Sequence, residues 1–388
     1  MNGWQSEPVT GAVLTNAQLV LADEVITGSI RIEDGKIAAI DSGAVRGAGS
    51  VDLDGDYLIP GLIDLHTDNL EKHHQPRKGV FWDPVIAVIS HDAQVIAAGI
   101  TTVFDSLTLG AASGWDARAE MIEPMISGLT VANAQGLLRA DHRLHYRCEV
   151  THPDIQAIVE AHLDHPLLQF LSLMDHAPGD RQSPDIERYR SFYLPAFGHD
   201  EAALDRHITD LMTKSKTIGP ENRRLIAELG RVRDIPLASH DDASVAHIEE
   251  AKDLGCAVTE FPTTLEAATA AKAVGLQVLM GGPNLILGGS HSGNVAAGDL
   301  AKAGQLDLFA SDYIPSSMLA AAFKLTAPPF GWTLPRAITT VTKVPAEAAG
   351  LDDRGEITEG RIADLVRVRQ VNGRPIVKGV YRQGVCLF

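Results

Sequence analysis

The segment LIPGLIDLHTDNLEKHH, residues 58–74, places two metal-ligand side chains at the end of an apolar run. His66 and Asp68 are two residues apart, and alternate side chains of a β-strand point to the same face. Pro60 and Gly61 break the chain just before the run. An imidazole and a carboxylate that converge in this way could bind a divalent metal ion. The alternative is a buried structural histidine beside a helix-capping aspartate.

Further apolar runs alternate with helix-like stretches along the rest of the chain. Including the run that ends in His66 and Asp68, there are eight: LIDLHTD (62–68), ITTVFDSL (100–107), HRLHYRCEV (142–150), LLQFLSLMDH (167–176), IPLASHDD (235–242), CAVTEFPTT (256–264), QVLMGGPNLI (277–286) and LDLFASDY (306–313). Eight strands with intervening helices predict an α/β fold, a (β/α)8 TIM-like barrel.

Active sites of such barrels lie at the carboxyl ends of the strands, so the last polar residues of the runs are the candidate ligands. They are His66, Asp68, Glu149, His176, His240 and Asp312. Imidazole and carboxylate ligands suit zinc, manganese or iron, and six of them can hold two ions. Two close cations make water acidic near neutral pH and polarise an electrophile, which predicts a hydrolase. Asp312 is then expected to be both a ligand and the catalytic proton acceptor.

Each candidate ligand also has a structural alternative. Glu149 could pair with Arg147, and Asp312 could cap the helix that follows it. Asp175 or Asp241 could replace a neighbour as ligand. The coincidence of these residue types at the same end of several strands favours a binuclear site.

The two chain ends differ from the α/β middle, because the pattern of residues 1–58 and 351–388 predicts short β-strands. We expect them to meet in one small β-sandwich beside a barrel of residues 59–350. The longest connection between strands runs over about sixty residues from His176 to Ile235. It is a candidate lid, with an ordinary surface insertion as the alternative.

Composition limits the partners. The 388 residues carry a formal net charge of −17, which argues against broad nucleic-acid binding, and no apolar run is long enough to span a membrane. Three cysteines are too few for a disulfide framework, and the N-terminus lacks a basic-then-apolar signal segment. We expect a cytoplasmic protein that acts on a small molecule, and a homo-oligomer is compatible with the sequence.

Loops after the strands suggest an anionic substrate. The segment GGPNLILGGSHSGN, residues 281–294, follows the seventh run with flexible glycines and backbone N–H groups, where barrels commonly hold phosphate. Cations follow the first and fourth runs, although such side chains usually face solvent. The predicted substrate-binding residues are Lys72, Arg181, Ser290, His291, Ser292 and Asn294.

The His-Thr-Asp motif resembles the His-x-His metal motif of the amidohydrolase superfamily, with Asp68 in place of the second histidine. The segment GEITEGRIADLVRV, residues 355–368, resembles the C-terminal signature of that superfamily. The resemblance implies a barrel hydrolase whose metals are bridged by a modified lysine or a glutamate. Because no lysine ends a central strand, it implies Glu149 as the bridge.

A narrower resemblance covers nearly the whole chain. The motifs HTDNLEKH, DHRLHYRCE, SLMDHAPGDRQ, LASHDDA, EFPTT, GGSHSGNVAA and ASDYIPSS resemble, in order, those of the α-D-ribose 1-methylphosphonate 5-triphosphate diphosphatases. This resemblance implies hydrolysis to α-D-ribose 1-methylphosphonate 5-phosphate and diphosphate, in the carbon–phosphorus lyase pathway of phosphonate catabolism. The alternatives are an amide hydrolase, such as an amino-sugar phosphate deacetylase or cyclic amidase, and a scaffold without catalysis.

Overall fold

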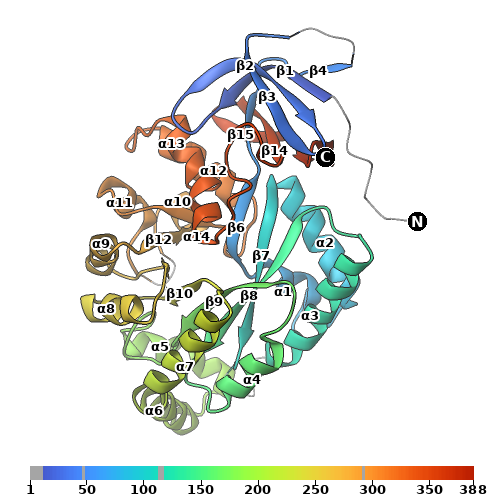
Figure 1. The fold of residues 1–388 in the computed structure, drawn as a ribbon. Coiled ribbons are helices and arrows are strands. Elements are labelled where there is room, and N and C mark those ends of the chain that lie inside the picture. The colour runs from blue at the N-terminus through green and yellow to red at the C-terminus, as the bar shows by residue number, and fades with distance from the viewer. Residues whose placement is uncertain (1–11, 46–48, 112–117, 291–292) are drawn as a thin grey trace.

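The computed structural model describes residues 12–45, 49–111, 118–290 and 293–388. In this part of the chain, eight parallel strands follow one another in sequence order around a barrel (Figure 1). They are β6 (Leu62–Thr67), β7 (Ile100–Leu109), β8 (Asp141–Glu149), β9 (Leu168–Met174), β10 (Leu237–His240), β11 (Val258–Glu260), β12 (Gln277–Gly281) and β13 (Leu308–Ala310). Each predicted run overlaps one of these strands, so the predicted barrel is confirmed.

The barrel closes between its first and last strands, where two predicted ligands lie. A parallel bridge joins Thr67 to Asp312, and the N–H of Asp312 donates to the carbonyl of His66 at 3.0 Å. Inside the barrel, Phe104, Phe170 and other apolar side chains form a buried core. A larger apolar core includes outward-facing strand residues and helix residues. The backbone that carries both predicted ligands is therefore fixed by hydrogen bonds and core packing.

Helices connect the strands and cover the outside of the barrel (Figure 1). They are α1 (Asn69–His74), α2 (Pro84–Ala97), α3 (Arg118–Ala134), α4 (Ile155–His162), α5 (Ile186–Tyr193), η1 (Leu194–Phe197), α6 (Glu201–Thr217), α7 (Gly219–Val232), α8 (Val245–Asp253), α9 (Leu265–Val274), α10 (Gly282–Leu287), α11 (Ala297–Lys302), α12 (Ser317–Thr326), α13 (Leu334–Thr339) and α14 (Lys343–Ala348).

Both chain ends meet in a second sheet, at the top of Figure 1. Its strands are β1 (Ala12–Val20), β2 (Val25–Glu33), β3 (Lys36–Ser42), β4 (Ser50–Asp52), β5 (Tyr57–Pro60), β14 (Leu365–Val371), β15 (Arg374–Arg382) and β16 (Val385–Cys386). The ends join where β14 pairs antiparallel with β5, with Leu365 opposite Pro60. This confirms that the two ends form one unit beside the barrel. The predicted domain boundary after residue 58 lies within β5.

The connection between β9 and β10 folds into α5, η1, α6 and α7. Asp185 begins α5 by accepting a hydrogen bond from the N–H of Arg188 at 3.0 Å, as an N-cap residue does. Tyr189, Leu204 and Ile208 form a small apolar cluster of their own inside the connection. This segment is therefore a packed subdomain, and its movement as a lid stays a prediction.

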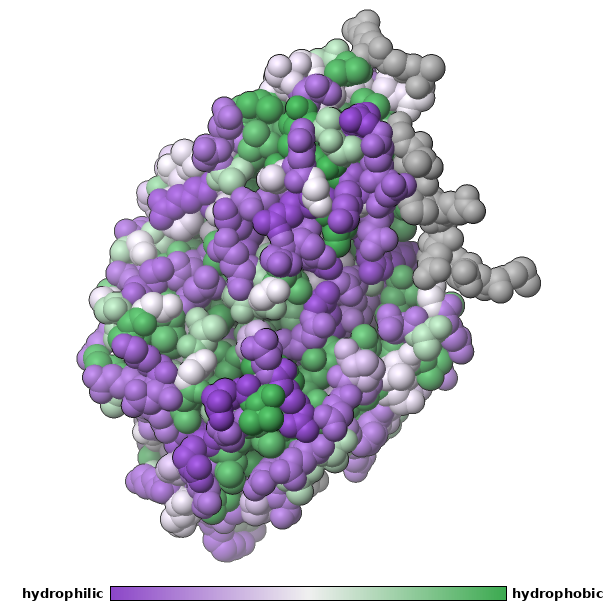
Figure 2. Space-filling model, viewed as in Figure 1, coloured by the Kyte–Doolittle hydropathy of each residue, from purple (hydrophilic) through white to green (hydrophobic). Residues whose placement is uncertain are grey.

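No helix in the described ranges is both long and apolar enough to cross a bilayer. On the face in Figure 2, hydrophilic residues separate scattered hydrophobic ones.

Candidate active site

A cavity of about 750 Å³ lies at the carboxyl ends of the barrel strands. Cavities of this size hold ligands as large as a nucleotide. The predicted metal ligands all line it: His66, Asp68, Glu149, His176, His240 and Asp312. The structure thus brings the six residues together in one place, and their roles as ligands stay predictions.

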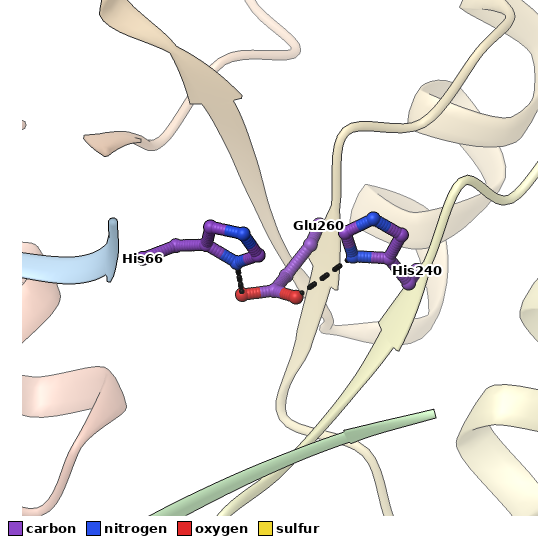
Figure 3. Close-up of side chains that lie close together, drawn as sticks. All are labelled: His66, His240 and Glu260. Atoms are coloured by element: carbon purple, nitrogen blue, oxygen red, sulfur yellow. Dashed lines mark hydrogen bonds and ion pairs between the residues drawn. The ribbon is translucent and has the colours of Figure 1, made fainter. Parts of the chain in front are cut away.

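Glu260, at the end of β11, lies between two of the predicted histidine ligands (Figure 3). Its Oε1 is 2.9 Å from Nδ1 of His66, and its Oε2 is 3.0 Å from Nδ1 of His240. Because a carboxylate accepts, the proton of each ring is assigned to Nδ1, and each Nε2 keeps its lone pair. Burial lowers the pKa of both histidines to about 3, which keeps the rings neutral. Both rings can therefore coordinate a metal through Nε2.

His176 is oriented in the same manner by a different carboxylate. Its Nδ1 lies 2.8 Å from Oε2 of Glu149, whose Oε1 accepts a hydrogen bond from the hydroxyl of Thr151 at 2.7 Å. Burial lowers the pKa of His176, but the hydrogen bond and the charge of Glu149 outweigh it, so the net shift is upward. Glu149 thus holds the ring of His176, and its role as a bridging ligand stays a prediction.

Asp241 lies where the Nε2 atoms of two histidines converge. Its Oδ2 is 3.4 Å from Nε2 of His240 and 3.9 Å from Nε2 of His176. This oxygen is buried and has no hydrogen-bond partner among the described residues. Burial raises the pKa of the Asp241 carboxyl to about 7. A buried carboxylate oxygen without a donor is costly unless a cation neutralises it, so the three groups fit a divalent metal.

Asp68 forms a partly buried ion pair with Arg147 that the sequence did not reveal. Its Oδ1 accepts from Nη1 of Arg147 at 2.6 Å and lies 3.8 Å from Nε2 of His66. Burial raises the pKa of Asp68, but the charge of Arg147 outweighs it, and the net shift is downward. The Asp68 side chain makes no capping hydrogen bond to α1, although Asp68 is the N-cap residue. Arg147 therefore pairs with Asp68 rather than with Glu149.

Asp312 sits at the closure of the barrel with a left-handed backbone, at φ 57°. Burial raises the pKa of its carboxyl to about 7, and the negative charge of Asp68 adds to the shift. The N-cap residue of α12 is Ser316, not Asp312. A carboxyl group that titrates near neutral pH is suited to exchange protons with a reacting water.

Only some of the predicted substrate-binding residues line the cavity. Ser290 and Asn294 line the cavity, and the side-chain amide of Asn294 donates to the carbonyl of Gln182 at 3.4 Å. Lys72 does not line the cavity, because its ammonium group donates to the carbonyl of Tyr313 and lies 5.1 Å from the centre of that ring. His291 and Ser292 lie outside the described residues.

Arg181 is buried and does not line the cavity. Its Nη1 donates to Oδ1 of Asp242 at 2.7 Å and to the carbonyl of His240 at 3.2 Å, and its Nη2 donates to Glu250 at 3.3 Å. These contacts use the guanidinium to hold the end of β10. The structure therefore places Arg181 as support for His240, not as a substrate contact.

Replacing Glu260 with glutamine should weaken divalent metal binding about 10- to 100-fold. Glutamine has the same size, but its amide offers one accepting oxygen, so one of the two histidines loses the acceptor that fixes its ring. Metal affinity would be measured by competition with a chelator. Glu266→Gln, at an exposed position on α9, is the control. Equal affinities in both variants would contradict the role given to Glu260.

A family model described as the amidohydrolase family matches residues 216–386. Among solved structures, 5-methylcytosine deaminase from Klebsiella pneumoniae superposes with a TM-score of 0.67 at 15% identity, over 97% of this chain and 98% of that one. N-acetylglucosamine-6-phosphate deacetylase from Pasteurella multocida gives 0.59 at 14% identity, over 96% and 98%. At such identities these structures support the fold alone.

The sequence relatives are more specific. The α-D-ribose 1-methylphosphonate 5-triphosphate diphosphatase of Escherichia coli (strain K12) is 42% identical over 377 residues, which cover 97% of this chain and 100% of that protein. L-hydantoinase of Paenarthrobacter aurescens is 30% identical over 95 residues, only 24% of this chain and 19% of that protein. The full-length match shows that the chain belongs to the same amidohydrolase family as the Escherichia coli diphosphatase.

Proposed function

We propose that this protein hydrolyses α-D-ribose 1-methylphosphonate 5-triphosphate to α-D-ribose 1-methylphosphonate 5-phosphate and diphosphate, in the carbon–phosphorus lyase pathway. The observation that carries the proposal is the likeness to the Escherichia coli diphosphatase along its whole length. The cavity supports it, because it is large enough for a ribose triphosphate and is lined by histidine and carboxylate side chains of the kinds that bind divalent metals. The amide-hydrolysing alternative has only the partial likeness to L-hydantoinase in its favour.

The residues of the cavity fit two divalent ions, with zinc as the first choice and manganese or iron as alternatives. His176, His240 and Asp241 would hold one ion, and His66, Asp68 and Asp312 would hold the other, with Glu149 as the bridge. The fit rests on the neutral rings of His66 and His240, whose Nε2 atoms keep their lone pairs, and on the oxygen of Asp241 that has no hydrogen-bond partner among the described residues. When bound, such ions make water more acidic and draw electron density from a phosphoryl group.

The side chains of this protein then orient the reactants and move a proton. The oxygen of water forms a bond to phosphorus, and the phosphoanhydride P–O bond breaks, with its electron pair leaving on the departing phosphate oxygen. Asp312 accepts the proton that the water loses, at its buried carboxylate. Glu260 keeps the rings of His66 and His240 in place during this step.

The test compares two reactions of the purified, metal-loaded protein. We expect diphosphate release from the ribose triphosphate and no acetate release from N-acetylglucosamine 6-phosphate. His240→Ala should lose metal and diphosphate release but keep a cooperative thermal transition, because the barrel core does not depend on this side chain. Acetate release without diphosphate release would favour the deacetylase, and full metal content in His240→Ala would remove His240 from the ligands.

We also propose that the protein binds a small molecule and works in the cytoplasm. A small phosphorylated sugar is the expected ligand, and the net charge of −17 disfavours nucleic acid. Cys148, Cys256 and Cys386 are free thiols, which suits the reducing cytoplasm.

A further inference from the structure

Three buried polar atoms without a hydrogen-bond partner belong to side chains in one corner of the cavity. In the part of the chain that the structure describes, Oε1 of Glu71, Oγ1 of Thr108 and Nε of Arg147 are buried and make no hydrogen bond. All three residues line the cavity, from α1, β7 and β8. We call Glu71, Thr108 and Arg147 the polar corner. Buried polar atoms are normally paired, so these three indicate a polar ligand group that completes them.

The three side chains of the polar corner are neighbours. Thr108 lies directly opposite Arg147 in the parallel pairing of β7 with β8. The pair two residues earlier, Ser106 and His145, is in contact inside the barrel, because Oγ of Ser106 lies 3.1 Å from Nδ1 of His145. Alternate residues of a strand share a face, so Thr108 and Arg147 also point inward side by side. Glu71 lies close enough for its charge and that of Arg147 to act on each other.

The charges at the polar corner are balanced by ion pairs. Nη1 of Arg147 donates to Oδ1 of Asp68 at 2.6 Å, and Nε of Arg118 donates to Oε2 of Glu71 at 3.1 Å. A phosphoryl group in this corner would therefore face two carboxylates as well as two guanidinium groups. A hydroxyl group is neutral, and it can both donate and accept a hydrogen bond. It therefore suits a corner where a carboxylate oxygen needs a donor and an arginine N–H needs an acceptor.

We infer that the polar corner binds the adjacent hydroxyl groups of the substrate's sugar ring. One hydroxyl would donate to Oε1 of Glu71, the other would accept from Nε of Arg147, and the hydroxyl of Thr108 can pair with either. The last torsion of a glutamate is soft, so Glu71 can turn this oxygen toward the ligand. The inference rests on the proposed function, because that function supplies a ribose. It leaves the phosphoryl groups to the rest of the cavity.

The probes for this site are methyl α-D-ribofuranoside 5-phosphate and its 2,3-dideoxy counterpart, with binding to the metal-loaded protein measured by calorimetry. The two probes differ only in the two hydroxyl groups, so the contribution of the phosphate cancels in the ratio of their Kd values. In the parent protein the dideoxy probe should bind about 10- to 100-fold more weakly, because it leaves buried polar groups without partners. Equal Kd values for the two probes would overturn the inference.

Thr108→Val and Glu71→Gln test two residues of the polar corner separately. Valine keeps the shape of threonine without its hydroxyl, and glutamine keeps one accepting oxygen for Arg118 but puts an amide in place of the other. Each variant should raise the Kd of the ribofuranoside probe about tenfold and leave that of the dideoxy probe nearly unchanged. A lower ratio in either variant supports the inference. Equal weakening of both probes in both variants would mean structural support alone and would overturn it, as would an unchanged ratio in both.

The matched controls are Thr269→Val and Glu266→Gln, which make the same chemical changes at exposed positions of α9. Both should keep the Kd ratio of the parent protein. Arg147 is left unchanged in every variant, because it also contacts Asp68, a candidate metal ligand. A ratio that falls equally in the controls would overturn the inference.

Failure of this inference and failure of the proposed function give different results, because probe binding is measured without turnover. If the ribose triphosphate is not hydrolysed but the Kd ratio depends on Thr108 or Glu71, the proposed function fails and the polar corner stands as a sugar-binding site. If hydrolysis occurs and the two probes bind equally well, the polar corner is overturned alone.

Discussion

Asp312→Asn is expected to lower kcat about 10²- to 10⁴-fold while the protein keeps most of its metal. Asparagine preserves the shape of the side chain and can still offer an oxygen to a cation, but it cannot accept the proton of the attacking water. Its backbone tolerates the left-handed conformation at this position as well as aspartate does. The measurement is kcat together with elemental analysis of bound metal in the same preparation.

The matched control is Asp352→Asn, which removes one negative charge at an exposed position outside the cavity. Its kcat and metal content should equal those of the parent protein. A loss of metal in Asp312→Asn that parallels the loss of rate would assign Asp312 to coordination alone. A rate near that of the parent protein would remove it from the reaction.

The barrel and the strand ends that carry the candidate ligands could be predicted because each strand leaves a local pattern. Short apolar runs that end in histidine or carboxylate recur along the chain, and parallel strands bring those ends to one face. His66, His240 and Asp312 were found in this way. Each lies at or just after the carboxyl end of a strand and lines the same cavity.

The hydrogen-bond partner of His66 and His240 could not be predicted with the same rule. Glu260 also ends a strand, but no sequence pattern distinguishes a carboxylate that binds metal from one that orients two histidines. The distinction depends on the distances from the Glu260 carboxylate to Nδ1 of His66, at 2.9 Å, and to Nδ1 of His240, at 3.0 Å. In sequence, Glu260 is 194 residues from His66 and 20 residues from His240. Only the folded barrel supplies those distances.

The two arginines show what spacing does and does not reveal. Arg147 and Glu149 are two apart on one strand, so their side chains share a face, and this spacing could have placed Arg147 in the cavity. Arg181 lies in a loop, where no period fixes the direction of a side chain. The direction of the Arg181 side chain follows instead from its left-handed backbone, at φ 44°, and from its hydrogen bonds to Asp242 and Glu250.

The second large effect is expected on stability, and it comes from a buried hydrogen-bond network next to the site. Asp105 on β7 accepts hydrogen bonds from Nε2 of His91 and from Nδ1 of His142, each at 2.7 Å. Nε2 of His142 is 3.4 Å from Oδ1 of Asp92, and all four side chains are fully buried. The amide of Asn69, next to Asp68, lies 2.9 Å from Nδ1 of His91. The network therefore joins α2, β7 and β8 to the segment that carries Asp68.

Charge makes this network sensitive to a single substitution. Burial lowers the pKa of His142, but Asp105 and Asp92 outweigh it and raise the pKa to about 10. Burial raises the pKa of Asp105, but the two histidines outweigh it and lower the pKa to about 2. At neutral pH the structure thus holds a buried imidazolium whose charge depends on Asp105 for compensation.

Asp105→Asn should lower the free energy of unfolding by about 3–5 kcal/mol, because it removes the nearer of the two carboxylates that compensate the buried charge of His142.

The sign of the pH dependence follows from His142. Its pKa is raised from 6.5 to about 10 on folding, so its stabilisation is complete below pH 6.5 and is lost as the pH rises through 10. Without Asp105 the pKa of His142 falls, so the total loss of stability between pH 6.5 and 10 should become smaller. Denaturant unfolding of the parent protein, Asp105→Asn and the exposed control Asp23→Asn across this range measures both effects. If Asp105→Asn loses little stability and its dependence on pH is the same as that of the parent protein, His142 is neutral in the folded protein, and Asp105 acts only as a hydrogen-bond acceptor.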